Sequence, residues 1–200
     1  MHIVVPIIIA YLLGSVSFSY LFGKWLKGID IRNYGSGNAG ATNTLRVLGK
    51  GPAIAVLLLD ALKGAVSVWI AWWIAPASPY AAAFAGLAAI IGHNWPIYFG
   101  FRGGKGIATT IGVMFSLAWI PALIAGVVAI AAIALTRFVS LGSLLFALLL
   151  PILLFFLHFP SVLGWSAVVV CVFAFIRHRN NIVKLLSGKE HKLGSKGTTP

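Results

Sequence analysis

Charged residues are scarce in this chain. Only 9% of its 200 residues are charged and 60% are hydrophobic, whereas a soluble domain averages about 25% charged residues. A water-soluble globule of this composition would expose large apolar patches and aggregate. The composition therefore argues against a soluble domain and indicates a protein whose solvent is the lipid bilayer.

Acidic residues and cysteine are rarer still. Asp30, Asp60 and Glu190 are the three acids, and they are too scattered to hold a pair of metal ions. Cys171 is the single cysteine, which excludes an intrachain disulfide and a CxxC metal site. It lies in an apolar run, where a thiol is a poor nucleophile. We therefore expect no metal, no cofactor and no carboxylate acting as general base.

Long apolar runs are abundant, and a membrane-spanning helix needs about 20 such residues. The first run lacks a basic leader and a small-residue cleavage site, so we expect it to be retained rather than cleaved as a signal. We predict one all-α, polytopic membrane domain over residues 1–193, with 194–200 as a disordered tail. Its helices, about seven in number, are expected at 3–23, 52–73, 80–98, 141–157 and 161–176, with two short ones inside 107–136.

The break inside 107–136 is expected at Pro121. One helix over this stretch would extend about 45 Å, which is much longer than the hydrocarbon core of roughly 30 Å. Proline interrupts a helix because it lacks a backbone N–H and clashes with the preceding turn. We therefore predict two short helices that meet at Pro121.

Basic residues are concentrated in four segments, and they give the chain a net charge of +12. The turns near 76–79, 121 and 158–160 contain none. By the positive-inside rule the basic segments face the cytoplasm, which places the N-terminus outside and the C-terminus inside. Many of these residues can simply maintain topology and contact anionic headgroups. The segments hold Lys24, Lys27, Arg32, Arg46 and Lys50; Arg102 and Lys105; Arg137; and six bases from Arg177 to Lys196.

Asp60 and Lys63 are charged residues within a predicted span. They are three positions apart, so they share a helix face. Charges inside a membrane are costly, and they are usually paired or functional. This pair either neutralises itself while packing the bundle or supports a functional site from behind.

The first basic segment is rich in glycine and in small polar side chains. A short helix is predicted over 41–48, ended by Gly49, and its N-terminus suits an anion. Arg46 adds a bidentate donor for phosphate or carboxylate. A flexible linker is the alternative. The candidate binding residues are Ser36, Gly37, Asn38, Gly40, Thr42, Asn43 and Arg46.

The second segment places a glycine-rich turn before a helix. Backbone N–H groups of such a turn can form a cradle for phosphate, to which Lys105 would add charge. It is not a Walker A loop, because Phe99 and Gly106 occupy positions where that pattern needs Gly and Ser or Thr. The candidate residues are His93, Gly103, Gly104, Lys105, Gly106 and Thr109.

The third segment, 177–185, is predicted to continue the last helix into the cytoplasm. His178 and Asn181 would lie on one face, with Lys184 next along it. His178 could contact an anion or transfer a proton. A basic helix end that only faces lipid is the alternative.

These features together suit a reaction with an already activated substrate. Donors for phosphate are plentiful and bases are few, so catalysis would come from positioning and charge stabilisation. No Ser-His-Asp set is evident. The His-to-Asp spacing of five that is used by acyltransferases with thioester donors is also missing.

The three segments resemble the three signatures of the bacterial acyl-phosphate-dependent glycerol-3-phosphate acyltransferases, the PlsY family. The residues that carry the resemblance are 36–43 with Arg46; 92–96 with 103–109; and Arg177, His178, Asn181, Ile182, Lys184, Leu185, Gly188 and Glu190. Departures are mild: Trp95 stands where Phe is common, and Lys184 where Arg is also found.

This resemblance implies an enzyme of phospholipid synthesis in the bacterial cytoplasmic (inner) membrane, with its site facing the cytoplasm. Acyl phosphate and glycerol-3-phosphate would give 1-acyl-glycerol-3-phosphate and phosphate, without nucleic acid as a partner. Ser36, Arg46, Lys105, His178 and Asn181 are expected to be catalytic, and the other candidate residues to bind substrate. An anion transporter or exchanger is the alternative, since glycine-rich breaks and intramembrane charges occur there too.

Overall fold

The computed structural model describes residues 2–76 and 78–194, and all of the regular structure in these ranges is helical. The chain divides into two compact units, one up to Ser116 and one from Leu117 onward. The prediction of a single domain over 1–193 remains a prediction. Within the predicted tail, Gly194 is described, and residues 195–200 lie outside the described ranges.

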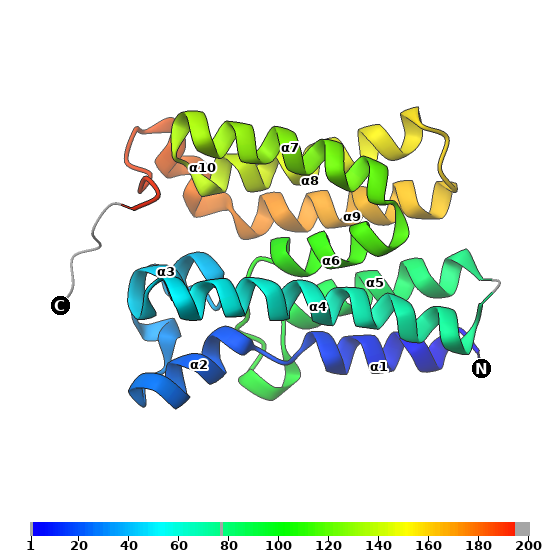
Figure 1. The fold of residues 1–200 in the computed structure, drawn as a ribbon, viewed down its shortest axis with the longest axis horizontal. Coiled ribbons are helices and arrows are strands. Elements are labelled where there is room, and N and C mark those ends of the chain that lie inside the picture. Colours follow the sequence, from blue (N-terminus) through cyan, green and yellow to red (C-terminus); the bar gives the residue numbers. More distant parts are fainter. Residues whose placement is uncertain (1, 77, 195–200) are drawn as a thin grey trace. The chain divides into compact units, whose positions relative to one another are not determined.

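The first unit contains six α-helices and two short 3-10 turns in its described residues. In Figure 1 these elements run from the blue N-terminal helix to the green α6. They are α1 (Val4–Gly14), α2 (Phe18–Lys27), η1 (Ile31–Asn33), α3 (Ala41–Leu48), α4 (Lys50–Ile74), α5 (Pro79–Asn94), η2 (Ile97–Phe99) and α6 (Ile107–Leu117).

Small residues let the helices of this unit pack closely. A Cβ on Gly14 would overlap the backbone of Ala89, and one on Gly92 would overlap the Tyr11 carbonyl, so α1 and α5 approach at backbone distance. Gly64 and Gly112 do the same for α4 and α6. Helices in a bilayer associate through such close packing because lipid supplies no hydrophobic force between them.

The first apolar run is interrupted, which the sequence analysis did not predict. α1 ends at Gly14 and α2 begins at Phe18, with Ser17 capping the new helix by accepting from the Tyr20 N–H. The stretch Val4–Lys27 as a whole is still long and apolar enough to cross a membrane. The break leaves the Val16 carbonyl without a regular helical partner, and Lys63 supplies one.

The second predicted interruption exists, but it is not at Pro121. α6 ends at Leu117 and α7 (Trp119–Thr136) begins after Ala118, which has φ −156° and ψ 73°. Pro121 therefore lies in the first turn of α7. Proline is tolerated there because the first N–H groups of a helix have no intrahelical acceptor to lose.

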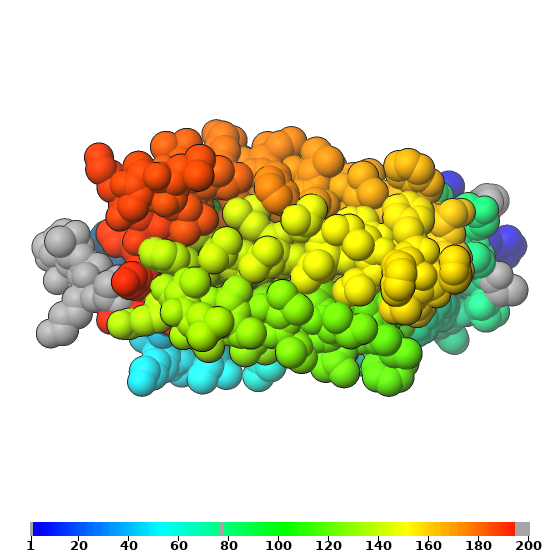
Figure 2. All heavy atoms as spheres, turned by 90° about the horizontal axis from the view of Figure 1, so that it is seen from above, coloured from blue at the N-terminus to red at the C-terminus, as the bar shows by residue number. Residues whose placement is uncertain are grey.

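The second unit packs three long helices and one short helix. α8 (Val139–Phe156) lies between α7 and α9 (Ser161–Arg177), as Figure 2 shows for the yellow α8 between yellow-green α7 and orange α9. α10 (Arg179–Leu186) is bent by 62° from α9. The predicted helical continuation of the last helix is present as α10, but the chain turns at His178, where φ is −99° and ψ is 7°.

Every predicted apolar run contains an α-helix, but the helices differ in length. Among the described residues, four stretches are long and apolar enough to cross a membrane, or five if α9 and α10 count as one span. α5 has 16 residues and α6 has 11. The predicted number of about seven crossings and the orientation of the termini therefore stay predictions.

Candidate functional site

The first two polar segments meet inside the first unit. Arg32 Nη1 donates to the Phe99 carbonyl at 2.7 Å and to the Arg102 carbonyl at 3.3 Å. A Cβ on Gly104 would lie 2.6 Å from the Ala39 carbonyl oxygen, so the two glycine-rich loops touch at backbone level. Segments about 65 residues apart in the sequence thus form one site.

Arg32 is held in place by Asp30, a pair that sequence reasoning missed. Nε and Nη2 of Arg32 donate to the two carboxylate oxygens at 2.9 and 2.7 Å. The Arg32 hydrogen bond lowers the pKa of the Asp30 carboxyl, although partial burial opposes the shift. The sequence feature that could have revealed this pair is an acid two residues before an arginine, just ahead of the glycine-rich segment.

α3 forms as predicted, over Ala41–Leu48, and ends at Gly49 with φ +90°. Asn43 on this helix is fully buried and makes three hydrogen bonds to the loop before it. Its Oδ1 accepts from the Ser36 N–H at 2.7 Å, and its Nδ2 donates to the Ile31 and Tyr34 carbonyls. Both amide protons of Asn43 are used within the protein, so this residue shapes the loop, and its expected contact with substrate stays a prediction.

Ser36 lies at the exposed tip of that loop. Gly35 and Gly37 flank it with φ +60° and +72°, a conformation that favours glycine. No hydrogen bond joins the Ser36 hydroxyl to another described residue. The hydroxyl is thus presented as a donor, and within the described part of the chain no base is hydrogen-bonded to it to activate it as a nucleophile.

The α3 helix also carries the predicted cation of this segment. Thr42 and Arg46 are four residues apart, so they share one face, and both are half-buried. The helix begins after Gly40 without a side-chain cap, and the Asn38 amide lies next to Gly40. Thr44, which sequence reasoning missed, anchors the helix through a buried hydrogen bond to Ser19 at 2.8 Å.

The glycines of the second segment are required mainly for packing. Side chains on Gly103 or Gly104 would overlap His93, and Gly106 has φ +81° with Asn94 directly beside it. The Gly104 N–H donates to the His93 carbonyl at 3.0 Å. Because that N–H already has an acceptor, it cannot also donate to phosphate. The predicted phosphate cradle therefore has fewer backbone donors than the whole glycine turn would offer. Lys105 is half-buried two residues before α6 begins.

Two polar side chains next to this loop are buried without a partner among the described residues. The atoms concerned are Nδ2 and Oδ1 of Asn94 and Oγ1 of Thr109. Thr109 was predicted to bind substrate, whereas Asn94 was missed. A buried polar group without a hydrogen bond is costly, so such groups are typical of functional sites.

The third segment belongs to the second unit. His178 is buried at the end of α9, and its Nδ1 donates to the Ala174 carbonyl at 2.8 Å, because a carbonyl can only accept. In a neutral His178 ring Nε2 is then the unprotonated nitrogen. Asn181 Nδ2 donates to Glu190 Oε1 at 2.7 Å, and Ser140 donates to the same oxygen. Lys184 is exposed on α10.

All three carboxylates have structural partners. Asp30 pairs with Arg32, Asp60 lies 2.7 Å from Lys63 Nζ, and Glu190 accepts from Asn181 and Ser140. A carboxylate so engaged is a poor general base. The chemistry left to the site is binding of anions and stabilisation of developing negative charge.

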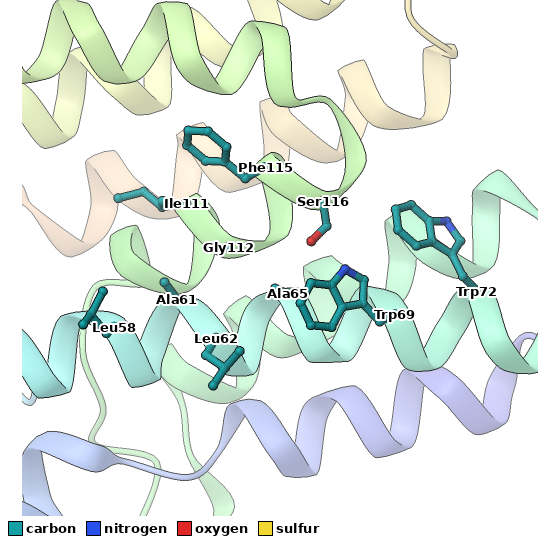
Figure 3. A pocket seen from close by; sticks show the side chains of 10 residues that line it. All are labelled: Leu58, Ala61, Leu62, Ala65, Trp69, Trp72, Ile111, Gly112, Phe115 and Ser116. Atoms are coloured by element: carbon teal, nitrogen blue, oxygen red, sulfur yellow. The ribbon is translucent and has the colours of Figure 1, made fainter.

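An apolar groove of about 570 Å³ runs between α4 and α6 in the first unit (Figure 3). It starts near Ile111, six residues beyond Lys105, and reaches Trp72 near the far end of α4. Such a groove suits a hydrocarbon chain. Its lining comprises Leu58, Ala61, Leu62, Ala65, Trp69, Trp72, Ile111, Gly112, Phe115 and Ser116.

The chain is similar to known proteins over nearly its full length. A family model for glycerol-3-phosphate acyltransferase matches residues 4–188. Two relatives with that name come from Shouchella clausii, 56% identical over 97% of each chain, and Halalkalibacterium halodurans, 57% identical over 95% of each chain.

Solved structures agree. The chain is similar to PlsY (YgiH), described as an integral membrane glycerol 3-phosphate acyltransferase, in its glycerol 3-phosphate form. The TM-score is 0.91 with 41% identity, over 96% of this chain and 95% of that one. Its lysophosphatidic acid form gives a TM-score of 0.87 with 40% identity, at the same coverage.

Proposed function

This chain belongs to the glycerol-3-phosphate acyltransferase family, and from that premise we propose that its acyl donor is an acyl phosphate. It is an integral membrane transferase of phospholipid synthesis. In the proposed reaction, the 1-hydroxyl oxygen of glycerol-3-phosphate attacks the acyl carbonyl carbon. The bond from that carbon to the phosphate oxygen breaks, and the products are lysophosphatidic acid and phosphate.

The engagement of all three carboxylates is the observation that carries this proposal. An unactivated donor would require a strong base or a protein nucleophile, and Ser36 has no base among the described residues. An acyl phosphate is already activated, because phosphate is a good leaving group. The protein then needs chiefly to orient the two substrates and to stabilise the charge that develops on the departing phosphate.

Lys105 and Arg46 are the cations that we assign to this charge. Each lies on a glycine-rich loop or short helix of the first unit, and these loops touch at Ala39 and Gly104. Ser36 adds an exposed hydroxyl donor. Donors preset at the leaving group stabilise the transition state more than the bound substrate.

His178 and Asn181 are assigned to glycerol-3-phosphate. The Nε2 acceptor of a neutral His178 suits a hydroxyl better than a phosphate, since phosphate offers acceptors only. Glu190 orients Asn181 through its amide nitrogen. We expect their loss to raise the apparent KM for glycerol-3-phosphate more than it lowers kcat with the substrate in excess.

The acyl chain is assigned to the groove between α4 and α6. α4 from Leu58 to Trp72 extends about 21 Å at 1.5 Å per residue, which is long enough for a fatty acyl chain. α6 begins just after Lys105. A donor whose phosphate binds near Lys105 can therefore lay its chain along the apolar wall of the same helix.

The membrane is proposed to be the bacterial cytoplasmic membrane, with this site on the cytoplasmic side. The basic residues at the ends of α2 and α3 and around Lys105 support that orientation by the positive-inside rule.

Purified protein in detergent tests the reaction directly. Palmitoyl phosphate with labelled glycerol-3-phosphate should yield labelled lysophosphatidic acid and one phosphate per product. Palmitoyl-CoA in place of the acyl phosphate should yield little product. Turnover with the thioester alone would overturn the donor assignment. Phosphate flux across sealed vesicles without any acylated product would instead favour the anion transporter.

A further inference from the structure

Three ionisable side chains form a buried cluster beneath the two glycine-rich loops. Lys63 Nζ lies 2.7 Å from Asp60 Oδ1 and 3.0 Å from His93 Nδ1. The side chains of Lys63, Asp60 and His93 are only 2%, 1% and 5% exposed. Asp60 and Lys63 come from α4, and His93 from the last turn of α5.

The Lys63 ammonium has a full set of acceptors. Besides Asp60 and His93, it donates to the Val16 carbonyl at 2.6 Å, in the break between α1 and α2. A carboxylate and a carbonyl can only accept, and an ammonium has three protons to donate. His93 Nδ1 lies 3.5 Å from Asp60 Oδ1 but only 3.0 Å from Lys63 Nζ. We therefore assign the third proton to the shorter contact, in which Nδ1 is the unprotonated nitrogen of the ring.

This assignment determines what the other ring nitrogen can do. When Nδ1 of a neutral histidine accepts, its proton is on Nε2. A Cβ on Gly104 would overlap His93 Nε2 and would lie 2.6 Å from the Ala39 carbonyl. The Nε2–H donor is therefore placed where the two glycine-rich loops meet.

We propose that Asp60, Lys63 and His93 are positioning residues that fix the Nε2–H tautomer of His93 and so hold the loop 103–106 against Ala39. The loop that carries Lys105 is then organised before substrate arrives, and the role assigned to the cluster rests on the proposed function of Lys105. A pair that only packs helices would not need the histidine contact. Partners that fix the tautomer and orientation of a histidine are well known behind metal sites, and the same physics applies here.

The tautomer is measurable without any activity. In protein labelled with 15N-histidine, the His93 signals, identified by their loss in His93→Gln, should show protonated Nε2 and bare Nδ1. The double variant Asp60→Leu/Lys63→Met removes both charges together, so no unpaired charge is buried. The spectrum of the folded double variant should show a changed His93 tautomer. If the double variant does not fold, the wild-type spectrum alone tests the assignment. Bare Nε2 in wild type, or an unchanged tautomer in the folded double variant, would overturn the proposal.

Two substitutions of His93 separate positioning from packing. Glutamine places its amide nitrogen where Nε2 lies, whereas asparagine places it where Nδ1 lies. We expect His93→Asn to lower kcat/KM about tenfold, the scale of one hydrogen bond, and His93→Gln to retain clearly more activity at equal thermal stability. Equal losses in both variants would contradict the proposal.

Ser67→Ala is the matched control on the same helix. Ser67 is buried and its hydroxyl donates to the Lys63 backbone carbonyl, so its loss disturbs α4 without touching the three side chains. This variant should keep the wild-type tautomer and kcat/KM. If the tautomer behaves as proposed but no variant of the enzyme, including wild type, uses acyl phosphate, then the proposed function fails and the network stands.

Discussion

Lys105 and Arg46 are the cations that we place at phosphate groups. In well-studied acyl-transfer sites the loss of one preset donor lowers the rate by about a hundredfold to a thousandfold. We therefore expect Lys105→Ala and Arg46→Ala each to lower kcat at least about a hundredfold, measured as lysophosphatidic acid release by folded, detergent-purified protein.

Arg137→Ala is the control for this prediction. Arg137 is an exposed cation whose Nη2 donates to the Leu193 carbonyl at 2.8 Å, and we assign it to topology and to the C-terminal segment. Its substitution should change turnover little. Near-normal kcat for Lys105→Ala would contradict the phosphate assignment.

Arg32 is a structural cation of the same site. Its planar fork joins both oxygens of Asp30 to the Phe99 carbonyl, and lysine cannot reproduce that geometry. We expect Arg32→Lys to raise hydrogen exchange in the segment 99–106 and to lower thermal stability. The segment 49–51, where a Cβ on either glycine would meet nothing within 4 Å, should exchange as in wild type.

The pH dependence of this pair follows from Asp30. The Arg32 hydrogen bond lowers the pKa of Asp30 from its usual 3.8. The pair therefore stabilises the fold above that pH, and the stabilisation is lost as pH falls through the lowered pKa. The stability difference between wild type and Arg32→Lys should shrink only in that acidic range. A difference that disappears near neutral pH would show that the ion pair is not its source.

Among the elements, the contact between α4 and α6 depends on Gly112 having no side chain. A Cβ on Gly112 would overlap the Ala61 carbonyl, whereas one on Gly126 in α7 would meet nothing within 4 Å. Overpacking costs about 1–3 kcal/mol, so Gly112→Ala should lower the thermal unfolding temperature. Gly126→Ala should leave it unchanged or raise it, because alanine favours the helix. Equal effects of the two substitutions would contradict the close approach.

The α4–α6 groove predicts an effect on substrate length. Ala65 is a half-buried residue that lines the groove, as Figure 3 shows. We expect Ala65→Leu to shift the preferred acyl phosphate to shorter chains. The ratio of kcat/KM between long and short donors should change at least about tenfold, the scale of one methylene in an apolar pocket.

Ala55→Leu is the matched control, because Ala55 is half-buried on the same helix but does not line the groove. It should leave the length preference unchanged. The same shift in both variants would place the acyl chain elsewhere.

For the whole molecule, the distribution of charge predicts the orientation in the membrane. A reporter that is fluorescent only in the cytoplasm should be active when fused to the C-terminus, since the last segment is strongly basic. A reporter that requires the external side should be active in the turn between α4 and α5, where no Lys or Arg occurs. An externally active C-terminal fusion would reverse the proposed topology.

Local sequence patterns were enough to predict where most of the helices of this protein lie. Apolar runs predicted where the helices lie, and Gly49 predicted the end of α3, because both depend on residues within a few turns. The glycine-rich motifs also led us to predict which segments bind anions, and that stays a prediction. The break at Pro121 was misplaced because proline is as compatible with the first turn of a helix as with its end.

Only the tertiary structure decided which residues hold those motifs in place. The partners of Arg32 lie 67 and 70 residues away, and Lys63 contacts Val16 and His93 at separations of 47 and 30. No local periodicity encodes such pairs. They arise because buried polar groups must find hydrogen-bond partners wherever packing brings helices together. Asn43 shows the same rule, since its amide completes the loop before α3.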